Sequence, residues 1–197
     1  MRFFFGFLAF IAAIVVVVLV VIGLVKTVNS GNSKINISQT INLLDDSSID
    51  SVARYTVTSP IVANENYRET RLTVSKNSRT LEVLHGYDKA VEKSTTLGNT
   101  TSAYKAFLGA LSAAQFSAKR DGVEGNPMSV CVTDNHFLYE LQLGNEKKVD
   151  TWTTTCSLSS GTFGGNVDGV SQLFRDQFPD YTNLSKTSDG TYNLAPL

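Results

Sequence analysis

FFFGFLAFIAAIVVVVLVVIGLV, residues 3–25, is a segment without a charged residue, a proline, an asparagine or a serine. As an α-helix that rises about 1.5 Å per residue, it would be roughly 35 Å long, enough to cross a hydrocarbon core of about 30 Å. A helix on the surface of a soluble protein has a polar face, and this segment is apolar on all sides. The sequence therefore predicts a transmembrane anchor over residues 1–28, with residues 3–25 in the lipid bilayer.

Three other kinds of apolar N-terminal segment fit this sequence less well. A cleaved signal peptide has an apolar core of about 7–15 residues and a cleavage site with small residues. This core is longer, and KTVNS follows it at residues 26–30. A lipoprotein needs a cysteine directly after the core, and the first cysteine here is Cys131. A type IV pilin carries a glutamate where this chain has Ile11, so we favour a membrane-spanning anchor.

Cys131 and Cys156 are the only two cysteines, and each lies in a strand-like run. With a further strand between them, the thiols would face each other at the rim of a meander, which predicts a disulfide. The alternative is two unrelated buried thiols. Flanking charges do not decide the orientation of the anchor, because Arg2 before it is matched by Lys26 after it. Since disulfides persist in oxidising compartments, we expect a cytoplasmic N-terminus and a C-terminal domain outside the plasma membrane.

The residues after the anchor predict a small domain with polar flanks. Residues 29–47 are polar and lack periodicity, which is typical of a stalk and lead-in segment. We assign residues 48–180 to the extracytoplasmic domain and residues 181–197 to a polar C-terminal tail. Alternation of apolar and polar residues predicts strands at residues 51–59, 68–76, 79–85, 129–133, 136–143 and 147–156.

Two stretches of this domain have the apolar spacing of helices. One runs from about residue 100 to residue 116, and the other ends before Pro179. Residues 86–98 are expected to be irregular. The order β, β-β, α, β-β-β, α predicts an α+β fold, in which two helices pack on one face of an antiparallel sheet of about five or six strands.

The composition indicates a binding domain rather than an enzyme or a nucleic-acid-binding protein. Residues 29–197 hold fifteen Lys and Arg against eighteen Asp and Glu, without the basic cluster that contacts a phosphate backbone. The only histidines, His85 and His136, have no ligand partner at metal-site spacing. Neither a Gly-x-Ser-x-Gly motif nor a phosphate-binding glycine loop is present. We therefore expect no catalytic residue, no metal and no cofactor.

Two aromatic residues are candidates for binding a partner. Phe163 lies in GTFGG, residues 161–165, and would insert into a partner if that loop is exposed; the alternative is that it folds back on the next helix. Trp152 is the second candidate, because tryptophan is enriched at binding hot spots. The alternative is that Trp152 lies in the core beside the disulfide. The sequence thus favours a non-catalytic domain that binds a protein or cell-envelope partner. The alternatives are a tethered inhibitor of an extracytoplasmic protease and a hydrolase without a recognisable motif.

Overall fold

The computed structural model describes residues 42–43, 45, 49–156 and 161–187. The chain divides into two compact units, Met1–Lys34 and Ile35–Leu197, and all described residues belong to the second. The predicted transmembrane helix lies outside the described residues. Among those that are described, no helix combines the length and the apolar composition needed to cross a bilayer.

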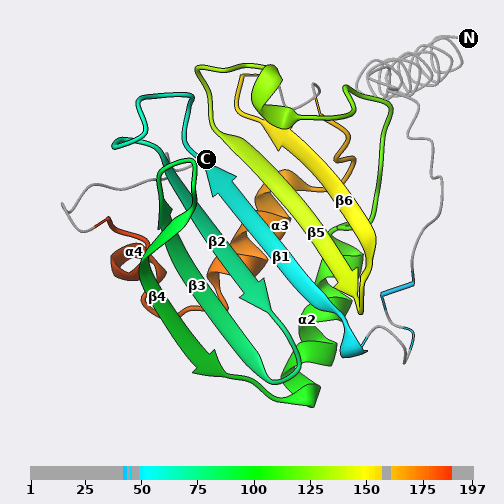
Figure 1. Ribbon diagram of the computed structural model, residues 1–197. Coiled ribbons are helices and arrows are strands. Elements are labelled where there is room, and N and C mark those ends of the chain that lie inside the picture. Colours follow the sequence, from blue (N-terminus) through cyan, green and yellow to red (C-terminus); the bar gives the residue numbers. More distant parts are fainter. Residues whose placement is uncertain (1–41, 44, 46–48, 157–160, 188–197) are drawn as a thin grey trace, which may run out of the picture. The chain divides into compact units, whose positions relative to one another are not determined.

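A six-stranded antiparallel sheet forms the framework of the domain (Figure 1). The strands are β1 (Val52–Thr58), β2 (Arg68–Val74), β3 (Ser78–His85), β4 (Ala90–Gly98), β5 (His136–Leu143) and β6 (Glu146–Thr154). In space they follow the order β4-β3-β2-β1-β5-β6. β1 therefore lies in the middle, where Tyr55 is paired with Leu72 of β2 on one side and with Tyr139 of β5 on the other.

Two helices cover one face of the sheet and leave most of the other face uncovered (Figure 1). α2 (Thr101–Ala113) begins after Thr100, and α3 (Val167–Arg175) begins after Asn166. The side chain of each of these two residues accepts a hydrogen bond from a backbone amide in the first turn of the helix. Such a cap is the usual way in which the start of a helix is stabilised. The shorter helical elements are η2 (Pro127–Ser129) and α4 (Tyr181–Leu184).

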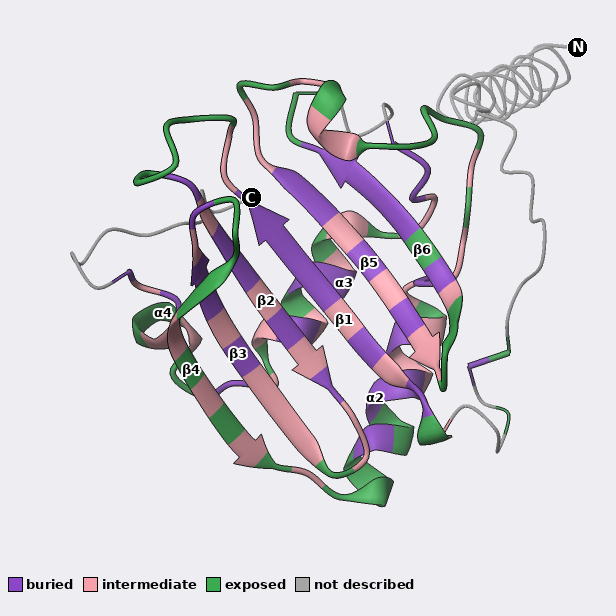
Figure 2. Ribbon diagram, viewed as in Figure 1, coloured by how far each residue is buried: buried purple, intermediate pink, exposed green. Residues whose placement is uncertain are grey.

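Aromatic rings between the sheet and the helices form the centre of the core. The ring of Tyr55 lies 5.4 Å from that of Tyr139 and 5.6 Å from that of Phe174 on α3. The Tyr55 hydroxyl accepts a hydrogen bond of 2.9 Å from Ser171, and burial raises the pKa of the tyrosine. Buried residues continue along β1, β5 and β6 (Figure 2). Because Phe174 and Ser171 of α3 both contact Tyr55 of β1, α3 is fixed against the middle of the sheet.

The structure confirms a small α+β domain with an antiparallel sheet and two packed helices, but three segments differ from the sequence prediction. Residues 86–98, expected to be irregular, contain β4. Residues 129–133, predicted as a strand, form the end of η2 and a loop. They find no strand edge beside β5, because β1 and β6 already occupy both of its edges. Residues 181–184 form α4 within the predicted tail.

Candidate functional site

The disulfide between Cys131 and Cys156 is formed, as the sequence predicts. It joins the loop before β5 to the residues that directly follow β6. These two segments lie side by side because His136, at the start of β5, is the antiparallel partner of Thr154, at the end of β6. The same loop is held by the imidazole of His136, whose Nε2 lies 2.6 Å from the carbonyl oxygen of Val130. The disulfide therefore fixes a loop that lies outside the sheet.

Trp152 and Phe163, the two candidate partner-binding residues, both lie in the interior. Phe163 is 1% exposed, and its ring stacks on that of Tyr139 with the centroids 3.8 Å apart. Trp152 is 5% exposed, and its ring lies 6.2 Å from that of His136. Phe163 belongs to the hydrophobic core, whereas Trp152 is buried but also lines a pocket beside β6 that is described below.

The described part of the glycine-rich loop, residues 161–165, packs against β6 instead of projecting from the domain. The amide of Phe163 donates a hydrogen bond of 3.0 Å to the carbonyl oxygen of Trp152. A Cβ atom at Gly161 would collide with that same carbonyl group, so glycine is required there by the close approach of two backbones. An inhibitory loop has to be exposed, and this segment therefore lends no support to the protease-inhibitor alternative.

A pocket of ≈ 310 Å³ lies beside β6, with walls that include Lys119, Glu124 and Trp152. The ammonium group of Lys119 is 2.8 Å from the carboxylate of Glu124. The hydrogen bond from Lys119, and after it the charge of Lys119, lower the pKa of Glu124. The charge of Glu124 is therefore paired with that of Lys119 at the wall of the pocket.

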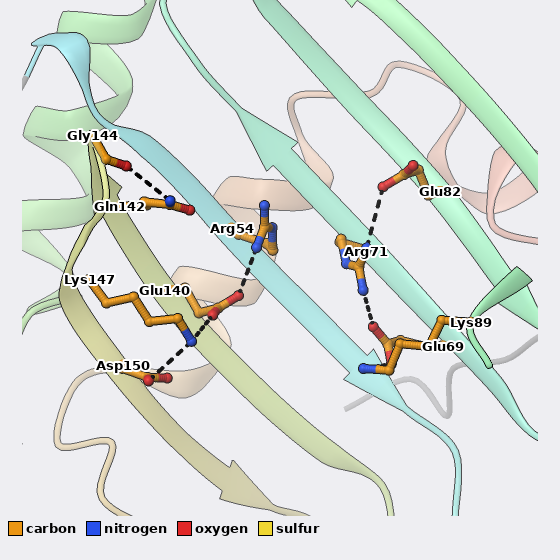
Figure 3. A network of polar contacts seen from close by, with 10 residues as sticks. All are labelled: Arg54, Glu69, Arg71, Glu82, Lys89, Glu140, Gln142, Gly144, Lys147 and Asp150. Carbon is orange, nitrogen blue, oxygen red and sulfur yellow. Dashed lines mark hydrogen bonds and ion pairs between the residues drawn. The ribbon is translucent and has the colours of Figure 1, made fainter. Parts of the chain in front are cut away.

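Charged side chains on the uncovered face join three neighbouring strands (Figure 3). Arg54 of β1 lies opposite Glu140 of β5, and the two side chains are 3.2 Å apart. Lys147 of β6 lies 2.7 Å from the other oxygen of Glu140 and 3.2 Å from Asp150. The charges of this part of the face are therefore paired with one another.

A second group of charges spans β2 and β3 (Figure 3). Arg71 lies 2.7 Å from Glu69 and 3.8 Å from Glu82. Lys89, in the turn after β3, is 3.1 Å from the second oxygen of Glu69. Because Glu69 is buried, its charge depends on these two cations, and losing one of them would leave a poorly compensated carboxylate.

The pKa values of Glu140 and Lys147 move away from neutral pH. Burial raises the pKa of Glu140, but the hydrogen bond from Lys147 and the charges of Lys147 and Arg54 outweigh it, so that the pKa lies below its ordinary value. The hydrogen bond to Glu140 raises the pKa of Lys147. A general acid or base needs a pKa close to the working pH. Glu140 and Lys147 therefore stay charged near neutral pH.

The two histidines lie on different strands, and each bonds to the backbone. His85 Nε2 is 3.1 Å from the carbonyl oxygen of Glu65, and His136 bonds to Val130 as described above. Within the described ranges, no group of three or more His, Cys, Asp and Glu side chains is placed to hold a metal ion.

A surface that the sequence reasoning missed lies at one end of the sheet, where three loops meet. It consists of Ile61 and Val62 after β1, Tyr87 after β3 and Val132 before β5, each between 40% and 47% exposed. The amide of Ile61 donates to the carbonyl oxygen of Val132 (2.8 Å), and the Tyr87 hydroxyl donates to that of Val62 (2.7 Å). We call these four residues the loop-end cluster. The signal in the sequence is the pair of large aliphatic residues directly after Pro60, in a loop whose residues 64–66 are polar.

Comparison with known proteins gives no relative from which a function follows. The chain matches no known family model, and no curated protein is significantly similar to it. Since one fold can carry many functions, the function has to be inferred from the residues and their geometry.

Proposed function

We propose that the chain is a non-catalytic, membrane-anchored domain that binds a protein or another component of the cell envelope outside the cytoplasm. The observation that carries the proposal is the disulfide between Cys131 and Cys156, because such a bond persists in oxidising surroundings. For a protein of the plasma membrane, these surroundings are on the outer side. The apolar segment of residues 3–25 supplies the anchor.

The charges on the uncovered face support binding rather than catalysis. Glu140 is held ionised between Lys147 and Arg54, and Glu69 is held between two further cations. Charges that are fixed in position give specificity, because a partner must match their pattern. The formal net charge of −1 provides no general attraction for the phosphate backbone, which argues against a nucleic-acid partner.

Crosslinking on intact cells tests this proposal. A membrane-impermeant, amine-reactive crosslinker should reach exposed lysines such as Lys89 and Lys119 and join the chain to a macromolecular partner. A chain without residues 1–28, retained in the cytoplasm, is the control and should remain unmodified. If the reagent modifies the full chain but the chain is recovered without a crosslinked partner, the binding function is contradicted. If the reagent does not reach it, the extracytoplasmic location is contradicted.

A further inference from the structure

Exposed apolar side chains are concentrated in the loop-end cluster. Among the described residues, six large apolar side chains are exposed, and four of them form this cluster. The other two, Val91 and Val123, lie in β4 and in the loop after α2. Single exposed apolar residues are normal on a protein surface, whereas a contiguous group marks a place of interaction.

The loop-end cluster is held in position before any partner binds. The ring of Tyr87 stacks on that of the buried Tyr67, with 4.2 Å between the centroids. Its hydroxyl donates to the carbonyl oxygen of Val62 and accepts a hydrogen bond of 3.2 Å from the amide of the same residue. The amide of Tyr87 donates to the side chain of Asn64 (2.9 Å). A surface that is fixed in this way loses little conformational entropy on binding, and tyrosine is among the residues enriched at binding hot spots.

The charges around the cluster leave an acidic surplus. Glu65, Asp88 and Asp134 are close in sequence to its residues, and none of the three makes an ion pair within the described part of the chain. The two basic residues beside it, Arg68 and Lys89, are each bound to a glutamate of the sheet, at 2.8 and 3.1 Å. The loops that carry the cluster therefore hold three carboxylates that form no ion pair among the described residues, and we call these three residues its acidic rim.

From the apolar surface and its acidic rim we infer that the loop-end cluster binds a short segment of another protein in which apolar residues are flanked by lysine or arginine. The inference rests on the proposed function and adds the place and the chemistry of the partner. The rim would repel the anionic lipids of a membrane surface. In a twofold-symmetric dimer, the acidic rim of one copy would face the acidic rim of the other, and the like charges would repel each other. A basic, apolar protein segment matches both features.

Selection from a random-peptide library displayed on phage tests the inference. The target is the full chain in nanodiscs, and the Ile61→Ser/Val132→Ser double variant serves for counter-selection. Both side chains are exposed, and the bond between these residues joins backbone atoms, so serine should leave the fold intact. Val123→Ser is the matched control, because Val123 is as exposed as Val132 but lies outside the cluster.

Enriched peptides are expected to combine aliphatic or aromatic residues with lysine or arginine. Synthetic copies should bind wild type and Val123→Ser equally, and the double variant at least about tenfold more weakly. Glu65→Gln should weaken binding by a smaller factor and reduce its dependence on salt. The inference is overturned if no peptide is enriched, if the enriched peptides are acidic, or if Val123→Ser weakens binding as much as the double variant does.

Other occupants would show themselves in the same variants. If the wild-type chain binds phosphatidylglycerol vesicles and the double variant does not, the cluster binds a bilayer. If wild type self-associates in sedimentation and the double variant does not, the cluster binds a second copy of the chain. Either result would overturn the inference. If the double variant is still crosslinked to the cellular partner, the cluster is not the binding surface, although the proposed function stands. If wild type has no partner on intact cells, the proposed function itself fails.

Discussion

Replacing both Cys131 and Cys156 with serine should lower the free energy of unfolding of the domain by about 3.5 kcal/mol. The bond links residues that are 25 positions apart, and in the chain-entropy model the closure of such a loop restricts the unfolded chain by about this amount at 25 °C. The loop that would be released lies outside the sheet, so the paired strands should keep their contacts. For a domain of this size, the loss corresponds to a Tm that is lower by about 10 °C.

Urea denaturation followed by tryptophan fluorescence measures this change. Trp152 is the only tryptophan, and it is buried in β6 close to the disulfide, so its emission reports the unfolding of the sheet. Wild type in a reducing buffer is the control and should unfold like the double-serine variant. The reasoning is refuted if the loss is less than about 1 kcal/mol, or if the reductant has no effect on wild type.

Three further substitutions test the packing and the charges. Phe163→Ala should cost about 3–5 kcal/mol in the same denaturation assay, because its ring is buried on Tyr139; a small effect would show that the ring is not part of the core. Gly161→Ala should cost about 2 kcal/mol or more, because the added Cβ would meet the carbonyl group of Trp152; unchanged stability would contradict that close approach. Glu140→Gln should cost about 1 kcal/mol at pH 7. The pKa of Glu140 is lower in the folded state than in the unfolded state. Its ion pairs therefore contribute fully to the free energy of unfolding above the pKa of the unfolded state, and this contribution is lost as the pH falls through the pKa of the folded state. A difference from wild type that persists at about pH 2 would contradict the ion-pair explanation.

Strands that bury one face were predictable from the sequence, and strands that do not were missed. In β2, the buried Leu72 and Val74 alternate with the partly exposed Arg71 and Thr73, which is the pattern of a half-buried strand. β4 lies at the edge of the sheet, where every side chain is at least partly exposed, so it has no such pattern. The run at residues 129–133 has the right residue types for a strand, but it cannot pair with β5, which follows it, because β1 and β6 occupy both edges of β5.

Contacts between distant parts of the chain had no local signal. Arg54 and Glu140 are 86 positions apart, and they meet only because β1 pairs with β5. The loop-end cluster is assembled in the same way from three loops. The disulfide was predictable because only two cysteines exist. Residue type did not distinguish the interior from the surface for Trp152 and Phe163, since large aromatic side chains are common both in cores and at interfaces.

Thiol alkylation on fractionated cells tests most directly whether the domain lies outside the cytoplasm. Cells are lysed without reductant in the presence of a maleimide reagent that adds a visible mass to each free thiol. The full chain should be found in the membrane fraction, with neither Cys131 nor Cys156 modified until the sample is reduced and denatured. Recovery of the full chain in the soluble cytosolic fraction, with both cysteines modified before reduction, would contradict both the anchor and the extracytoplasmic location.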